Sequence, residues 1–279
     1  MRACGSILQP TMVLREVKSY STSTCPAQVE TDVGLGVIKG LGNPIGTGAL
    51  VCELIAAEMG TWLGLEIPPF AVIDVCDIEV QMTTRDGRWL GPMRPPLYFS
   101  SFMQGALDSA PEALLKKLER PADIARLVVF DTWMRNVDRH DPRHGVPEVN
   151  LDNLLYCKPK GRRRYTLVPI DHSHCLVEGD LADVGEINDA VTDRNIYGLF
   201  PEFIPFIDSE SVAAAVARLA TLDRTFVEDC VNHIPTAWPM SGGAKATLID
   251  LICLRAAFVV ETVATALVPD PRLPGIKWN

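Results

Sequence analysis

The chain lacks the marks of several large classes of protein. Its 279 residues include eight cysteines, but no two of them form a Cys-x-x-Cys pair. The sequence therefore gives no sign of a disulfide framework or a zinc ribbon and predicts reduced, cytoplasmic thiols. Positive charge is scarce, because 26 lysines and arginines stand against 35 aspartates and glutamates for a formal net charge of −9. Nucleic acid attracts a positive surface, so we expect no general nucleic-acid binding.

Long apolar runs and targeting segments are also missing. The most apolar stretch, residues 246–268, is interrupted by Asp250, Arg255 and Glu261. Charges at these intervals predict a buried helix and exclude a membrane span. Residues 1–18 lack the continuous apolar core of a secretory signal. We therefore expect a cytoplasmic protein without a membrane partner.

The two commonest phosphate-binding loops are absent. Six glycines occupy positions 34–48, but they form neither G-x-G-x-x-G nor a loop that ends in G-K-[S/T], which excludes a Rossmann or Walker site. A polar turn upstream, SYSTST at residues 19–24, has hydroxyls and backbone N–H groups that can meet phosphate oxygens. An ordinary hairpin turn is the alternative interpretation.

The composition changes along the chain. Residues 1–106 alternate short β-branched runs with turns, and residues 107–279 are mostly helical, so we expect two lobes that share a cleft. With 47% hydrophobic residues the chain can bury a sizeable core. The expected elements are a strand at 33–40, a helix at 48–65, strands at 68–80 and 91–102, a helix at 121–136, a hairpin of 153–157 with 165–170, and helices at 209–234 and 246–268.

A lysine stands inside an otherwise apolar strand. Lys39 lies in VGLGVIKG, where a lysine needs either the exposed face of the strand or a charged partner. Glu53 falls in the first turns of the following helix and can point back at the strand, and Glu58 is a second possible partner. Protein kinases use a strand lysine held by a helix glutamate to bind nucleotide phosphates. A lysine that reaches from an edge strand into solvent is the plain alternative.

Chemically versatile side chains gather in NVDRHDPRHGVPEVNLDNLLY, residues 136–156. Asp138 follows an apolar helix, Asn153 precedes an apolar strand, and Asp171 ends the next strand of the expected hairpin. An aspartate in the first position can accept the proton of an attacking hydroxyl. An asparagine and a second aspartate supply the hard oxygen ligands that Mg²⁺ prefers. The ordered set of lysine, glutamate, aspartate, asparagine and aspartate therefore indicates phosphoryl transfer.

Three segments together resemble the HipA-like kinases, distant relatives of the phosphoinositide and protein kinases: VIKGLGNPIGTGALVCELIAAEMGTWLGLEIPPF, DTWMRNVDRH and VPIDHSHCL. The resemblance extends over residues 30–180 as a series of ordered motifs. It implies an α+β, bilobal, protein-kinase-like fold. In such a fold, residues 1–106 form a small β-rich N-lobe that binds nucleotide, and residues 107–279 form a mainly helical C-lobe with the catalytic loop and the metal site.

The resemblance also implies a role for each residue. Lys39 is the catalytic lysine that binds the nucleotide phosphates, Glu53 is its helix partner, and Asp138 is the catalytic base. Asn153 and Asp171 are the magnesium ligands, and Asp171 also belongs to the nucleotide site. ATP and Mg²⁺ are the implied cofactors, and the implied reaction transfers the γ-phosphoryl group to a hydroxyl, with a protein serine or threonine preferred.

Other functions and partners are compatible with the same residues. A kinase of lipids or small molecules is one alternative, and a nucleotide-binding scaffold that has lost catalysis is another. Some HipA-like proteins are toxins paired with an antitoxin, so an antitoxin or another regulatory partner is a further expectation that the resemblance allows.

One departure from the family pattern concerns the catalytic loop. Kinase catalytic loops place the asparagine five positions after the base, whereas Asp138 and Asn153 are fifteen positions apart. The ten additional residues, 141–150, are expected to bulge out near the acceptor side of the cleft. Asn150 competes with Asn153 for the metal, and we favour Asn153 because apolar strand residues follow it directly.

Histidines offer a different metal chemistry. Four of the five histidines fall within 35 positions of one another, with two cysteines nearby, and such ligands suit zinc. The set comprises His140, His144, His172, His174, Cys157 and Cys175. Ordinary loop histidines with hydrogen-bond partners are the alternative.

The tip of the expected hairpin is strongly basic. KPKGRRR, residues 158–164, carries five positive charges on an acidic protein. A solvated turn is one interpretation. A docking patch for an acidic protein segment, an anionic headgroup or RNA is the other.

Overall fold

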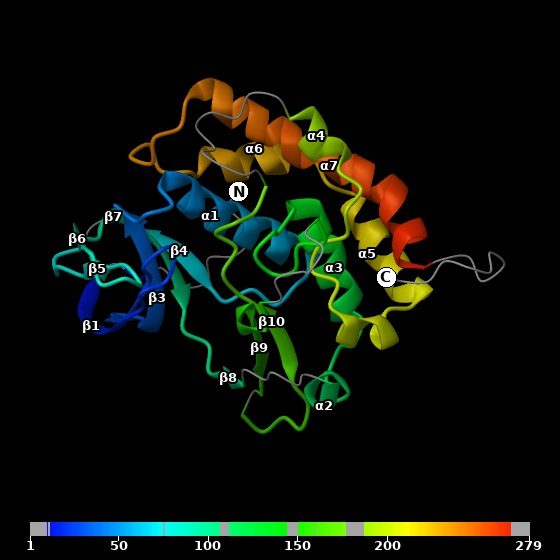
Figure 1. Cartoon of the computed structure of the whole chain (residues 1–279), viewed down its shortest axis with the longest axis horizontal. Coiled ribbons are helices and arrows are strands. Elements are labelled where there is room, and N and C mark those ends of the chain that lie inside the picture. Colours follow the sequence, from blue (N-terminus) through cyan, green and yellow to red (C-terminus); the bar gives the residue numbers. More distant parts are fainter. Residues whose placement is uncertain are drawn as a thin grey trace.

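The computed structural model describes residues 10, 12–74, 76–106, 112–143, 150–158, 160–176 and 187–268. A sheet-rich part and a helical part lie side by side, with helix α1 between them (Figure 1). The strands are β1 (Val13–Ser19), β2 (Ala27–Thr31), β3 (Gly34–Leu41), β4 (Phe70–Ile73), β5 (Gln81–Thr83), β6 (Trp89–Pro92), β7 (Arg94–Ser101), β8 (Gly105–Ala106), β9 (Leu154–Cys157) and β10 (Thr166–Pro169).

The helices follow mainly in the second half of the chain. They are α1 (Thr47–Leu63), α2 (Glu112–Leu115), α3 (Asp123–Met134), the 3-10 helix η1 (Leu151–Asn153), α4 (Asn188–Thr192), the 3-10 helix η3 (Pro201–Phe206), α5 (Ser209–Leu219), α6 (Arg224–Asn232) and α7 (Gly242–Leu267). Among the described residues, no helix combines the length and the apolarity that crossing a membrane requires.

The strands form three antiparallel sheets. The largest has five strands in the order β1-β2-β3-β7-β4, β5 pairs with β6, and β8, β9 and β10 form a small sheet in the order β10-β9-β8. This small antiparallel sheet system followed by a mainly helical part confirms the predicted fold class. The boundary between lobes at residues 106 and 107 stays a prediction.

Helix α1 is buried on nearly every side because it packs between the large sheet and the helices that follow. Thirteen of its seventeen residues are buried, which is typical of a helix enclosed by other elements and not of one at a surface. Its apolar side chains belong to the same core cluster as those of α3, α5 and α7. The helix therefore joins the two parts through one hydrophobic core, and it places the buried Glu53 side chain at their junction.

The structure adds one pair of strands to the predicted elements and divides one predicted helix in two. Strands β1 and β2 were not predicted, because β1 is an edge strand whose side chains beyond Val13 are exposed and whose pattern does not alternate. The single helix expected at 209–234 is two helices, with a break between Leu219 and Arg224. Asp223 starts the second helix, because its side chain accepts a hydrogen bond from the Thr225 backbone N–H at 3.1 Å, a typical N-cap.

Candidate active site

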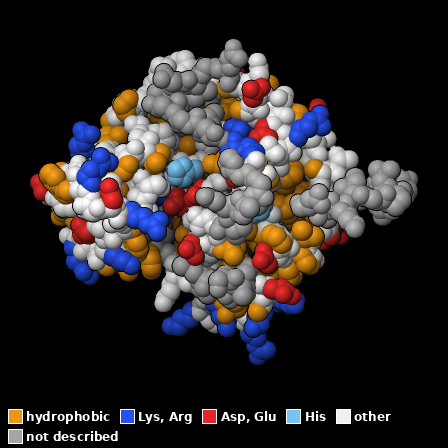
Figure 2. Space-filling view, viewed as in Figure 1, with side chains coloured by type: hydrophobic (Ala, Val, Ile, Leu, Met, Phe, Trp, Pro, Cys, Tyr) orange, Lys and Arg blue, Asp and Glu red, His pale blue; other side chains and the backbone are white. Residues whose placement is uncertain are grey.

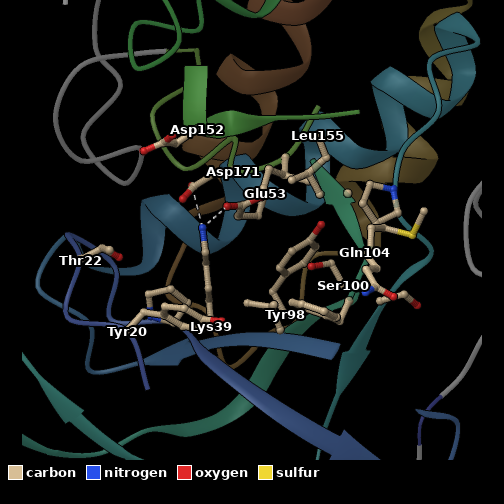
Figure 3. A pocket seen from close by; sticks show the side chains of 18 of the residues that line it. Tyr20, Thr22, Lys39, Glu53, Tyr98, Ser100, Gln104, Asp152, Leu155 and Asp171 are labelled. Carbon is tan, nitrogen blue, oxygen red and sulfur yellow. Dashed lines mark hydrogen bonds and ion pairs between the residues drawn. The ribbon is translucent and has the colours of Figure 1, made fainter. Parts of the chain in front are cut away.

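A cavity of about 570 Å³ lies between the large sheet and the β9–β10 hairpin. Pockets of this size hold nucleotide-sized or drug-sized ligands. Figure 3 shows Lys39, Glu53 and Asp171 pointing toward one another at one end, with Tyr98 and Ser100 of β7 along the wall. On the molecular surface, acidic side chains and a histidine gather where the sheet-rich and helical parts meet (Figure 2).

Lys39 enters the cavity because of its place in strand β3. Ile38 is fully buried in the core on one face of the sheet, and side chains alternate along a strand, so its neighbour Lys39 points to the opposite face. There Lys39 is only 5% exposed. Its ammonium forms ion pairs with Glu53 of α1 and with Asp171 Oδ1, the latter at 2.7 Å. Of the two carboxylates considered on α1, Glu53 is therefore the one that binds Lys39.

The charges of this cluster stabilise one another. Burial alone would lower the pKa of Lys39, but the carboxylates of Asp171 and Glu53 raise it above its usual value. Burial would likewise raise the pKa of Asp171, yet Lys39 holds it well below its usual range. For Glu53, burial outweighs the attraction of Lys39, and its pKa is raised. A charged lysine shared by two carboxylates satisfies the requirement that buried charges be paired.

A serine completes the cluster. The Ser173 hydroxyl lies 2.7 Å from Lys39 Nζ, 2.8 Å from Glu53 Oε1 and 2.7 Å from Asp171 Oδ1. Asp171 precedes it with a φ of 53°, a left-handed conformation that turns the chain sharply after β10. This turn aims both side chains at Lys39.

The loop after α3 is fixed by a buried ion pair. Asp131 on α3 and Arg139 are both fully buried, and Arg139 Nε contacts Asp131 Oδ2 at 2.7 Å. Asn136 donates to the other oxygen of Asp131 at 3.1 Å, and Arg139 also donates to the backbone carbonyl of Asn153 at 2.5 Å. These bonds hold the loop that contains Asp138 against the start of the β9–β10 hairpin.

The loop brings Asp138 and Asn153 together. Asn153 Nδ2 donates to Asp138 Oδ2 at 2.7 Å, and Asn150 Nδ2 reaches the same oxygen at 3.4 Å. The Asn153 carbonyl accepts a hydrogen bond from the Ile170 N–H at 3.0 Å, so Asn153 stands across the hairpin from the residue before Asp171. Of the bulge predicted at 141–150, residues 144–149 lie outside the described residues.

The donor chemistry of the site fits both a nucleotide and magnesium. Asn153 donates its amide nitrogen to Asp138, and an amide oxygen is a neutral hard ligand. Asp171 adds a carboxylate that stays ionised, because the pKa of its side chain is held low. Oxygen ligands of this kind suit Mg²⁺, and the buried ammonium of Lys39 at the end of the cavity suits a phosphate.

The structure gives no support to the zinc alternative. Within the described parts of the chain, no three His, Cys, Asp or Glu side chains are placed to hold a metal ion, and His144 lies outside those parts. His172 is buried against the Phe130 ring, and burial holds its pKa well below the usual value. His140 packs on Phe200 in the same way, and burial lowers its pKa too.

Two other predicted segments have clear positions. The turn at 19–24 joins β1 to β2, its Tyr20 and Thr22 side chains line the cavity, and Ser23 Oγ lies 3.4 Å from His174 Nε2. The described residues of the basic segment, 158 and 160–164, lie between β9 and β10, and none of them lines the cavity. There Arg162 forms an exposed ion pair with Glu119.

Sequence reasoning missed Ser173, Asp131 and the role of Arg255. Asp131 has a signal that could have found it, since a carboxylate inside the apolar run VVFDTWM must have a buried partner. Arg255, which interrupts the apolar C-terminal stretch, is 1% exposed and donates to the carbonyls of Thr132 and Trp133 at the end of α3. Ser173 carries no comparable signal.

Comparison with solved structures identifies the fold as that of a kinase. The crystal structure of the Helicobacter pylori proinflammatory kinase CtkA is similar to this chain with a TM-score of 0.58 and 14% identity, over 93% of this chain and 98% of that one. A Ralstonia eutropha JMP134 protein assigned as an aminoglycoside phosphotransferase matches over 94% of this chain and 96% of its own with 12% identity. Its TM-score is 0.25, which is too low to carry an argument.

The family is shown by the sequence itself. The family model for the HipA-like kinases matches residues 29–257, and the chain belongs to this family. The resemblance stated from its motifs is thereby confirmed, and the chain is a member of a family of phosphotransferases. No curated protein matched the chain.

Proposed function

We propose that this protein is an ATP- and Mg²⁺-dependent kinase that transfers the γ-phosphoryl group to a hydroxyl of a protein serine or threonine. The observation that carries the proposal is the Lys39 ammonium, held by Glu53 and Asp171 at the end of a nucleotide-sized cavity. Family membership supports phosphoryl transfer, and the acceptor and the residue roles are the parts we propose.

Each residue of the site has a proposed role that follows from its chemistry. Lys39 binds phosphate oxygens, and Glu53 keeps the lysine aimed into the cavity. Asn153 and Asp171 hold the magnesium ion, which supplies positive charge to the phosphates when it is bound. Positioning and charge neutralisation dominate catalysis in this class of reaction.

Asp138 acts on the acceptor. Its carboxylate orients the attacking hydroxyl and accepts the proton as the reaction proceeds. The bond from Asn153 to Asp138 Oδ2 orients this carboxylate. The buried Asp131–Arg139 pair keeps this loop in place.

The nature of the acceptor can be tested with ATP labelled in its γ-phosphate. The protein is incubated with Mg²⁺ and, in separate reactions, with a protein extract, extracted lipids and a mixture of small alcohols. We expect acid-stable label on serine or threonine of a protein. Label in the lipid or small-molecule reaction alone would establish the alternative acceptor class, and nucleotide binding without transfer to any acceptor would indicate a scaffold.

A further inference from the structure

The turn between β9 and β10 carries a concentration of positive charge that the proposed catalytic residues do not use. Residues 158–164 contain five lysines and arginines and no acid, and all five of these side chains are exposed. Figure 2 shows basic side chains projecting from the end of the molecule where Figure 1 places this turn. The turn therefore presents a cationic surface to the solvent.

A second basic segment, residues 112–120, lies against the same turn. The Tyr165 N–H donates to the Lys117 carbonyl at 3.0 Å, and the Glu119 N–H donates to the Tyr165 carbonyl at 2.8 Å. The three lysines and arginines of residues 112–120 are exposed as well. The two segments together form one surface, which we call the basic patch and define as residues 112–120 and 158–164.

The charge of the basic patch is opposite to that of the protein. The patch has eight lysines and arginines against two glutamates, a net charge of +6, and since the whole chain carries −9, the rest carries −15. A long polyanion such as nucleic acid would extend beyond the patch onto this acidic surface and be repelled there. A short anionic segment is attracted without that cost.

The cations of the basic patch are not all neutralised within the chain. Three of them are each paired with a carboxylate at 2.6 to 2.9 Å. Lys117, Lys160 and Arg163 form no ion pair within the part of the chain that the structure describes. Exposed ammonium and guanidinium groups of this kind can pair with the carboxylates of another polypeptide.

The β9–β10 hairpin connects the basic patch to the proposed active site. Asn153 directly precedes β9, and the basic turn follows the other end of this strand of four residues. At a rise of about 3.3 Å per residue the strand spans about 13 Å. An extended polypeptide covers that distance with about four residues. One protein can therefore contact the patch with one segment and reach the catalytic residues with another.

We propose that the basic patch is a docking site for a segment of the protein substrate that is rich in aspartate and glutamate. A spacer of at least about four residues separates this segment from the serine or threonine that receives the phosphoryl group. The inference rests on the proposed function, because it assumes that the acceptor is a protein.

The first test measures binding to the full chain by fluorescence anisotropy, without ATP. The probe is a labelled peptide of alternating glutamate and glycine, and the matched probe has glutamine in place of every glutamate. We expect the full chain to bind the glutamate peptide and not the glutamine peptide. Added salt should weaken the binding, because the patch is exposed to solvent.

Charge reversal in the turn tests where the peptide binds. We expect Lys160→Glu combined with Arg163→Glu to lower affinity for the glutamate peptide about tenfold, and the neutral pair Lys160→Gln with Arg163→Gln to lower it about threefold. The matched control is Arg85→Glu with Arg88→Glu, an equal change of charge at two exposed positions in the turn between β5 and β6. This control should change the affinity by less than about twofold.

The binding results can overturn the proposal in three ways. Equal losses in the test and control pairs would show that the peptide responds only to the net charge of the protein. Unchanged affinity in both Lys160 and Arg163 pairs would place the peptide elsewhere. Tighter binding of a single-stranded oligonucleotide or of phosphatidylserine vesicles, lost in the same variants, would assign the patch to nucleic acid or to a membrane. Thermal unfolding verifies that each variant is folded, and the neutral pair decides the matter if the reversed pair is not.

A second experiment connects docking to phosphoryl transfer. The protein is incubated with MgATP labelled in its γ-phosphate and a protein extract, in the presence of an excess of either peptide. The glutamate peptide should slow the labelling of protein substrates, and the glutamine peptide should not. Binding of the glutamate peptide at the patch without any slowing would overturn the docking role. Absence of labelling even without peptide would instead show that the proposed function is wrong.

Discussion

Asn153 donates a hydrogen bond of 2.7 Å to Oδ2 of Asp138, although fifteen positions separate the two residues. The two side chains therefore meet despite the ten residues by which their spacing exceeds that of the kinase pattern. Asn150 lies near the same oxygen at 3.4 Å, a longer and weaker contact. The two asparagines are thus distinguishable by substitution.

Asn153→Ala is expected to be the severe change of the pair. It removes both the proposed metal ligand and the bond that orients Asp138, so turnover should fall by about a hundredfold or more. Asn150→Ala is expected to lower turnover by less than about threefold, because only the weaker contact is lost. Steady-state phosphotransfer rates of the two variants decide the matter. A severe Asn150→Ala with a mild Asn153→Ala would reverse our assignment.

Lys39→Met is expected to weaken ATP binding and also to lower stability. The lysine binds phosphate in our account, and in the nucleotide-free protein it neutralises Glu53 and Asp171, which are left facing each other without it. Calorimetric titration with ATP and thermal unfolding measure the two effects. Lys18→Met is the control, because Lys18 also lines the cavity, where its ammonium lies over the Tyr20 ring. Equal effects of the two changes on ATP affinity would contradict the role of Lys39 in binding the phosphates of ATP.

Asp171→Asn tests the metal assignment. The change keeps the size of the side chain but removes its negative charge, so the variant holds the magnesium ion less well. The negative charge of the triphosphate is then poorly neutralised, and turnover should fall by several orders of magnitude. EDTA should abolish activity in the unaltered protein, and added Mg²⁺ should restore it. Inhibition by a zinc-selective chelator that zinc alone reverses would instead favour a histidine site.

Asp131→Ala tests the buried ion pair that holds the loop containing Asp138. It leaves the fully buried guanidinium of Arg139 without its carboxylate, a change that destabilises proteins by about 3–5 kcal/mol. Urea unfolding measures the loss. Lys116→Ala removes an exposed pair with Glu112 and should leave the free energy of unfolding nearly unchanged. A small change in the free energy of unfolding in Asp131→Ala would show that water or another group takes the place of the lost carboxylate beside Arg139.

Much of the fold was predictable because its signals are local. The apolar helix at α1, the hairpin of β9 and β10 and the C-terminal helix all follow from periodicity and turn residues. Strands β1 and β2 were not predictable in this way. The exposed side chains of β1 give no alternation, and the register of its pairing with β2 shifts at two points.

The candidate site was predictable where chemistry demands a partner. A lysine in an apolar strand needs either an exposed face or a charged partner, and Glu53 in the first turns of the next helix is one of two acids that can supply the charge. The contacts of Ser173 and the pairing of Asn153 with Asp138 were beyond the sequence, because both depend on how the turn after β10 and the long loop close in space. These contacts join segments that are far apart in the sequence, and no local sequence pattern predicts them.

The most direct test of the central claim compares the unaltered protein with Asp138→Asn in one experiment. Both are titrated with MgATP, and both are then assayed for transfer of labelled γ-phosphate to protein. Our account predicts equal MgATP affinity and transfer that is slower by about a hundredfold to ten-thousandfold in the variant, because only the proton acceptor is lost. Equal rates of transfer by the two proteins would contradict it.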